Sequence, residues 1–230
     1  MARYSLPAAA ADQLVLLLDA LAAEAAPHTT ISDPAAAVDA HVADSLSGLE
    51  VEALGAARRI ADLGAGAGFP GLVLAIALPA AQVDLIESAR RKAAVIDRLR
   101  QAAKIENARA VVARAEEWAR TPPALGGGRE AYEAVTARAV APLPVLVEYA
   151  APLLRLVGVL VAWKGARDPA EEGLGMGAAD EVGLALEEVL RVDPFEGARN
   201  RHLHVYRKVG PTAERFPRRP GIAAKRPLGR

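Results

Sequence analysis

The clearest chemical signal in the sequence is a glycine-rich run, Asp62-Leu63-Gly64-Ala65-Gly66-Ala67-Gly68-Phe69-Pro70-Gly71. Three alternating glycines follow a short apolar segment and precede a second apolar segment that predicts a helix. Glycine tolerates positive φ and lets a ligand approach the backbone, and the amino end of a helix offers free N–H groups. The run therefore predicts a ligand-binding loop, and a glycine turn without a ligand is the weaker interpretation.

Two cofactors suit this loop. Residues 66–71 match the G-x-G-x-x-G pattern of dinucleotide-binding proteins. The three alternating glycines after Asp62 match the loop that binds S-adenosylmethionine in class I methyltransferases. Either cofactor needs an acid at the end of the second strand for its ribose, and Glu87 suits both. Asp62 would face the negative pyrophosphate of NAD but the ammonium and sulfonium of S-adenosylmethionine, so methyl transfer is favoured over hydride transfer.

Three further positions are placed for ligands at the ends of later strands. Ala115 and Glu116 follow the third strand, in the loop that contacts the adenine ring in a methyltransferase; a helix start with solvated glutamates explains them equally well. Arg138 ends the fourth strand, where ligands bind in open α/β sheets, and suits a methionine carboxylate or a phosphate. Lys164 ends the fifth strand at the same edge.

Residues that the sequence lacks restrict the set of possible methyl acceptors. Carbon methylation of pyrimidines usually needs a cysteine nucleophile, and the chain has no cysteine. Enzymes that methylate exocyclic amines commonly carry an Asn/Asp-Pro-Pro-aromatic run after the fourth strand, whereas residues 135–142 are VTARAVAP. A purine N7 has a free lone pair at neutral pH, so alignment alone supplies most of the rate. We assign no catalytic acid or base and no metal site.

These residues need a scaffold of alternating strands and helices. The alternation predicts an α/β fold, a Rossmann-like class I methyltransferase sheet of seven strands with helices on both faces. No helix separates the last two strands, so we expect them to pair antiparallel. We expect turns over 168–180, helices over 71–78, 88–104 and 144–154, and strands over 60–63, 82–86, 108–112, 132–136, 157–163, 184–192 and 202–209.

Charge divides the chain into three parts. Residues 1–57 carry one base and eight acids and predict an N-terminal helical extension, with helices over 8–26, 34–45 and 49–58. Residues 58–210 form the predicted methyltransferase domain. Residues 211–230 are a basic, proline-rich tail in which Arg218 and Arg219 suit contacts to RNA phosphates; a disordered, solubilising tail is the alternative.

The sequence also indicates a location. No apolar run approaches the roughly 18 residues that a membrane span needs. The first residues lack the basic-then-apolar order of a secretory signal. We expect a cytoplasmic monomer that does not bind membranes.

Together the motifs resemble one family, the RsmG (GidB) methyltransferases, over roughly residues 10–210. The Gly-Phe-Pro-Gly end of the loop is more specific than a bare glycine motif. The resemblance implies a bacterial enzyme that uses S-adenosylmethionine to methylate guanine N7 in 16S, small-subunit ribosomal RNA, free or within the subunit. The matching segments are 41–46 (HVADSL), 62–71, 114–117 (RAEE), 137–139 (ARA), 163–165 (WKG) and 201–202 (RH).

The resemblance also assigns individual residues. It implies that Lys164 and Arg201 lie on the RNA side and that Glu87 binds the ribose. It also implies cofactor contacts for Gly64, Phe69, Ala115, Glu116 and Arg138, to which the loop pattern adds Asp62, Gly66 and Gly68. Two alternatives remain open at this point: an NAD-linked oxidoreductase and a non-catalytic RNA-binding factor in ribosome assembly.

Overall fold

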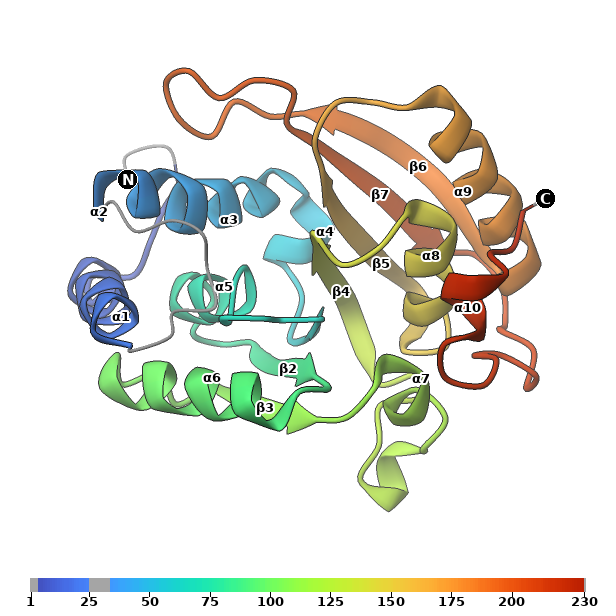
Figure 1. The fold of residues 1–230 in the computed structure, drawn as a ribbon, viewed down its shortest axis with the longest axis horizontal. Coiled ribbons are helices and arrows are strands. Elements are labelled where there is room, and N and C mark those ends of the chain that lie inside the picture. The colour runs from blue at the N-terminus through green and yellow to red at the C-terminus, as the bar shows by residue number, and fades with distance from the viewer. Residues whose placement is uncertain (1–3, 25–33, 230) are drawn as a thin grey trace.

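The fold is built on one seven-stranded sheet (Figure 1), seen in a computed structural model that describes residues 4–24 and 34–229. The strands lie in the order β3-β2-β1-β4-β5-β7-β6, and β7 is antiparallel to both neighbours while the other pairs are parallel. This confirms the predicted sheet with its antiparallel last strand. The bounds are β1 (Arg59–Leu63), β2 (Gln82–Glu87), β3 (Ala108–Val112), β4 (Tyr132–Arg138), β5 (Leu154–Lys164), β6 (Leu184–Arg191) and β7 (His202–Lys208).

Helices cover both faces of the sheet because its central strands are apolar on both faces. Along β5, Val159 and Val161 pack into one core cluster, while Leu160 and Ala162 pack into the other. The first cluster lies under α1 (Ala10–Ala23), α5 (Gly71–Ala77) and α6 (Arg90–Ala102), and the second under α8 (Leu143–Ala150) and α9 (Pro169–Val182). Alternate side chains of a strand point to opposite faces, so one strand serves both cores.

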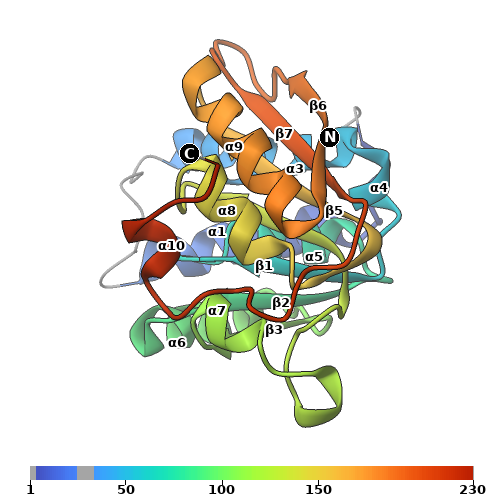
Figure 2. The same ribbon diagram turned by 90° about the vertical axis from the view of Figure 1, so that its right-hand side faces the viewer.

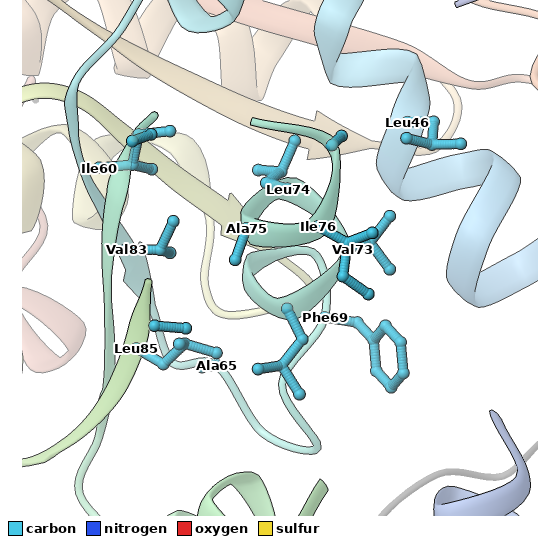
Figure 3. Close-up of a cluster of buried hydrophobic side chains, with 14 of the residues drawn as sticks. Leu46, Ile60, Ala65, Phe69, Val73, Leu74, Ala75, Ile76, Val83 and Leu85 are labelled. Atoms are coloured by element: carbon cyan, nitrogen blue, oxygen red, sulfur yellow. The ribbon is translucent and has the colours of Figure 1, made fainter. Parts of the chain in front are cut away.

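The register brings the predicted site residues to one edge. Leu63, the last residue of β1, pairs with Ile86 on one side and with Ala137 on the other. The glycine loop, Glu87 and Arg138 therefore leave three adjacent parallel strands at the same height. Figure 3 shows Ala65 and Phe69 at the loop end of the apolar cluster around α5, with Leu46 from the N-terminal extension nearby.

The N-terminal extension is helical but less regular than expected. The predicted helix over 34–45 consists of α2 (Pro34–Ala37), a π-helical turn η1 (Val38–Ala43) and α3 (Asp44–Leu46). The one over 49–58 is shorter, a 3₁₀ turn η2 (Ser47–Glu50) followed by α4 (Glu52–Gly55). Of the first predicted helix, α1 ends at Ala23, and residues 25 and 26 lie outside the described part.

The prediction of turns over 168–180 is wrong, because this stretch is α9. Asp168 caps the helix by accepting hydrogen bonds from the N–H groups of Ala170 and Glu171, and proline follows at the first helical position. The glycines suggested turns, but one of them serves packing. A Cβ on Gly175 would lie 2.7 Å from the Tyr206 hydroxyl. Tertiary packing therefore outweighs the low helix propensity of glycine.

The C-terminal segment packs on the domain instead of forming a free arm. Figure 2 shows residues 211–229 crossing the molecule past α7 (Ala115–Trp118) and α8 to the short helix α10 (Ile222–Lys225). Phe216 and Ala223 are 2% and 1% exposed. Among residues 4–24 and 34–229, no helix is long and apolar enough to cross a membrane.

Candidate active site

A cavity of about 610 Å³ opens at the carboxyl edge of the sheet. The glycine loop forms one wall, and the other lining residues include basic side chains from four further segments. A smaller cavity of about 150 Å³ adjoins it, since Gly64 lines both. The larger cavity is lined among others by His41, Asp44, Gly66, Phe69, Lys92, Arg138, Lys164 and Arg201. The smaller one is lined among others by Glu87, Ala115, Glu116, Val140 and Tyr149.

The three alternating glycines have different roles. All three have positive φ. A Cβ at Gly64 would lie 2.9 Å from Val140, and one at Gly68 would lie 2.5 Å from Leu72, so both positions exclude side chains because of protein packing. At Gly66 the nearest atom would be the Gly64 carbonyl oxygen, 3.8 Å away. Gly66 is therefore the position where the loop leaves room for a ligand.

Asp62 lies beneath the loop, outside the set of residues that line the two cavities. Its carboxylate is fully buried and accepts hydrogen bonds from Thr136 Oγ1 at 2.7 Å and from the Gly71 N–H at 2.9 Å. It thereby ties the first residue of α5 to β1 and β4. Burial raises the pKa of the Asp62 carboxyl to about 6, although the two hydrogen bonds lower it. Its position makes Asp62 a support of the loop.

This raised pKa makes a prediction about stability. The folded chain holds the Asp62 proton more tightly than the unfolded chain does. Binding of this proton therefore adds to the free energy of unfolding below the ordinary pKa of 3.8, and the contribution is lost as pH rises through the folded-state pKa of about 6. Asn can accept from Gly71 and donate to Thr136 without titrating. Between about pH 4 and about pH 7.5, Asp62→Asn should therefore gain about 2.5 kcal/mol in unfolding free energy relative to wild type. Urea denaturation at both pH values measures this, and parallel pH profiles would contradict it.

Glu87 joins the loop to the end of β2. Its Oε2 accepts from the Gly66 N–H at 3.1 Å and its Oε1 from the Ala89 N–H at 2.8 Å. The side chain is 7% exposed and lines the smaller cavity. A carboxylate has about four lone-pair sites, so Glu87 retains capacity for two ribose hydroxyls. The predicted ribose contact thus lies beside the one glycine that leaves space.

Arg138 connects the cavity to the N-terminal extension. Its Nη1 donates to Asp44 Oδ2 at 2.9 Å, to the Ala40 carbonyl at 3.0 Å and to Ser45 Oγ at 3.3 Å. Arg201 approaches the other Asp44 oxygen at 3.7 Å. Asp44 therefore holds two arginines at the cavity wall. Nothing local in the sequence indicated that Arg138, far along the chain, would meet the segment 41–46.

Sequence reasoning missed His41 as a lining residue. Its ring stacks on Phe69 with centroids 4.5 Å apart and planes at 19°. Burial, followed by the charge of Arg138, lowers the pKa of His41 to about 4, so the ring is neutral at neutral pH. Lys92, from the first turn of α6, was also missed, because a single lysine near a helix start carries no distinguishing pattern. A neutral aromatic pair and several cations therefore share one cavity.

The four candidate RNA residues do not gather at one place. Lys164 and Arg201 line the larger cavity, and Lys164 also pairs with Glu171 at 2.6 Å. Arg218 does not line this cavity, and its guanidinium is bound to the buried Glu148 at 2.5 Å. Arg219 is exposed on the C-terminal segment. Arg218 therefore serves the fold, and the interpretation of Arg218 as a free phosphate contact is replaced.

The geometry fits S-adenosylmethionine at the boundary of the two cavities. Gly66 leaves space for a ligand, Glu87 offers acceptors, and Ala115 and Glu116 form the far wall of the smaller cavity. A strand order of 3-2-1-4-5-7-6 with this loop defines the class I S-adenosylmethionine-dependent methyltransferases. The fold resembles cofactor-bound Rv0187 from MTB (TM-score 0.59, 21% identity, 87% of this chain and 91% of that one). It also resembles MtNAS in complex with S-adenosylmethionine (TM-score 0.58, 13% identity, 86% and 72%).

Within that class, the chain belongs to the GidB family, rRNA small subunit methyltransferase G, whose model matches residues 11–185. Two relatives share the name "Ribosomal RNA small subunit methyltransferase G". The one from Rubrobacter xylanophilus is 44% identical over 82% of this chain and 72% of its own length. The one from Pelotomaculum thermopropionicum is 41% identical over 82% and 77%. The family resemblance inferred from the motifs is confirmed.

Proposed function

We propose that this chain transfers the methyl group of S-adenosylmethionine to N7 of a guanine in small-subunit ribosomal RNA, in the bacterial cytoplasm. The observation that carries the proposal is the larger cavity, which joins the glycine loop to Lys92, Arg138, Lys164 and Arg201. One wall suits the cofactor and the other suits a polyanion. The family match supports the reaction and the class of RNA.

The chain's own residues act by positioning. When bound, the cofactor supplies an electrophilic methyl group on a sulfonium. The Gly66 backbone and Glu87 hold its adenosine part beside the loop. Guanine N7 would take the methyl group through its lone pair and lose no proton, while the sulfur–methyl bond breaks and its electron pair returns to sulfur, leaving the neutral thioether S-adenosylhomocysteine. The site therefore needs alignment and no general base. His41, neutral and stacked on Phe69, offers an uncharged aromatic surface beside the reacting position.

The test is methylation of RNA that lacks the modification. Small subunits and naked 16S RNA from a deletion strain are incubated with the full chain and labelled S-adenosylmethionine, and mass spectrometry maps the product. One 7-methylguanine is expected. Methylation at another atom would refute the N7 assignment, and RNA binding without transfer would favour the assembly factor. Calorimetric binding of NAD in place of S-adenosylmethionine would favour the oxidoreductase.

The basic wall gives a prediction about salt. If Arg201 contacts a phosphate, Arg201→Ala should flatten the log–log dependence of RNA affinity on salt by roughly 0.7 to 0.9 units. Cofactor affinity should stay unchanged, because Arg201 takes no part in the contacts of Gly66 and Glu87 at the proposed cofactor site. The matched control is Arg155→Ala, which removes an exposed arginine at the amino end of β5, on the opposite edge of the sheet. Equal salt slopes for wild type and Arg201→Ala would contradict the contact.

A further inference from the structure

The C-terminal segment, residues 211–229, is fastened along its length by side chains of the domain. Arg129 donates to the carbonyls of Thr212 and Phe216, and Arg120 donates to the Pro217 carbonyl at 2.8 Å. Further along, the Gly229 N–H donates to Glu181 at 3.1 Å. A solubilising tail would not need arginines of the domain to hold its backbone.

Arg218 forms the strongest of these attachments. Its Nε and Nη2 make a two-pronged contact with Glu148, and its backbone N–H also donates to Glu148 at 3.1 Å. The Glu148 side chain is 1% exposed, and that of Arg218 is 25% exposed. A buried carboxylate that loses its partner is strongly destabilised. Arg218 therefore fixes where the segment lies on α8.

The segment then contacts the wall of the smaller cavity directly. The Gly221 N–H donates to Glu116 Oε1 at 2.8 Å, and Glu116 is 4% exposed. Tyr149, the neighbour of Glu148 on α8, lines the same cavity. Burial and the nearby Glu116 raise the pKa of the Tyr149 hydroxyl to about 12, so it stays protonated. One lining residue, Glu116, is thus held from outside by the segment, and a second, Tyr149, lies next to the segment's anchor on α8.

The wall needs this support because its own element is small. Ala115 and Glu116 belong to α7, a single turn of four residues. An isolated turn is unstable, since the cost of nucleating a helix is recovered only over many residues. The C-terminal segment braces this turn at Glu116 and is also bound by Arg120, two residues beyond the end of the turn.

We propose that residues 211–229 brace the wall at the adenosine end of the cofactor site, with Arg218 as the positioning residue that locks the segment in place. This inference rests on the proposed function, because it takes the smaller cavity as the adenosine end. No residue of the segment lines the larger cavity, whereas its hydrogen bond to Glu116 reaches the wall of the smaller one. Loosening the segment at Arg218 should therefore affect the adenosine end of the cofactor site and not the basic residues of the larger cavity.

The experiment measures ligand affinity by calorimetry on full-length variants. Arg218→Ala should bind S-adenosylmethionine about tenfold more weakly, a loss typical of one hydrogen bond to a charged group. It should bind 5′-methylthioadenosine, which lacks the amino-acid part, more weakly by the same factor. Arg218→Lys should recover part of the loss. Lys225→Ala removes one exposed positive charge from the same segment and should match wild type.

The outcomes separate the possible failures. A folded Arg218→Ala variant with wild-type affinity for both ligands would overturn the inference. So would a loss confined to S-adenosylmethionine, because the effect would then lie at the methionine end. Unchanged cofactor affinity with weakened RNA binding would instead make the segment a phosphate-binding arm. If Arg218→Ala does not fold, Arg218→Lys carries the same comparison. A wild-type chain that bound neither ligand would refute the cofactor site itself.

Discussion

Gly66→Val is expected to weaken S-adenosylmethionine binding by at least about 100-fold while the chain remains folded. The loop leaves open space at this position, since a new Cβ would have the Gly64 carbonyl oxygen 3.8 Å away as its nearest atom beyond the adjacent residues. The valine would fill the space reserved for the ligand. The backbone φ of +58° adds strain of about 1–3 kcal/mol for a branched residue. Calorimetry with circular dichroism on the same sample measures both effects.

Two other glycines make this experiment specific. Gly197 also has positive φ (+82°) and open space around it, but it lies in the loop between β6 and β7. Gly197→Val therefore carries the same backbone strain and should bind the cofactor normally. Gly68→Val should lose stability instead, since its Cβ would meet Leu72 at 2.5 Å. If Gly66→Val kept native affinity, the ligand would have to approach the chain elsewhere.

Glu87→Ala is expected to weaken the cofactor by about 1–3 kcal/mol, the range for hydrogen bonds to a charged group, or about 5- to 150-fold. The carboxylate would no longer accept from the ribose, and the N–H groups of Gly66 and Ala89 would lose their acceptor. Glu87→Gln keeps one acceptor oxygen and should lose less. Isothermal titration of each variant gives the dissociation constants.

The control for Glu87 is another glutamate at the far edge of the sheet. Glu106 is exposed next to the amino end of β3, so Glu106→Ala removes the same charge without touching the site. Its affinity should equal that of wild type. Should Glu87→Ala also equal wild type with its fold intact, the ribose contact would belong to another residue.

Local patterns were enough to predict the framework of the site. Apolar runs separated by helical segments predicted the seven strands, because strand and helix periodicity are properties of neighbouring residues. Parallel strands end at one edge, so residues that follow them were expected to meet, and Glu87, Arg138 and the glycine loop do so. The helix α9 was missed because its glycines have low helix propensity and the packing that favours Gly175 lies on β7 and α8.

Only the tertiary structure decided whether each residue of the loop faces open space for a ligand or packs against other parts of the protein. Glycine spacing could not show that Gly66 faces open space, whereas Gly64 packs against Val140 and Gly68 against Leu72. The sequence could not show whether Asp62, the acid before the loop, supports the loop or contacts the cofactor. The hydrogen bonds that Asp62 accepts from Thr136 and Gly71 show that it supports the loop.

The C-terminal segment shows the same limit for charge. By sequence, Arg218 and Arg219 are two adjacent bases in a proline-rich run and look alike. In the fold one is bound to Glu148, 70 residues earlier, and the other is exposed. The sequence determines how many cationic side chains a segment carries. Whether a cation meets RNA or a buried carboxylate depends on contacts between distant segments, which packing alone creates.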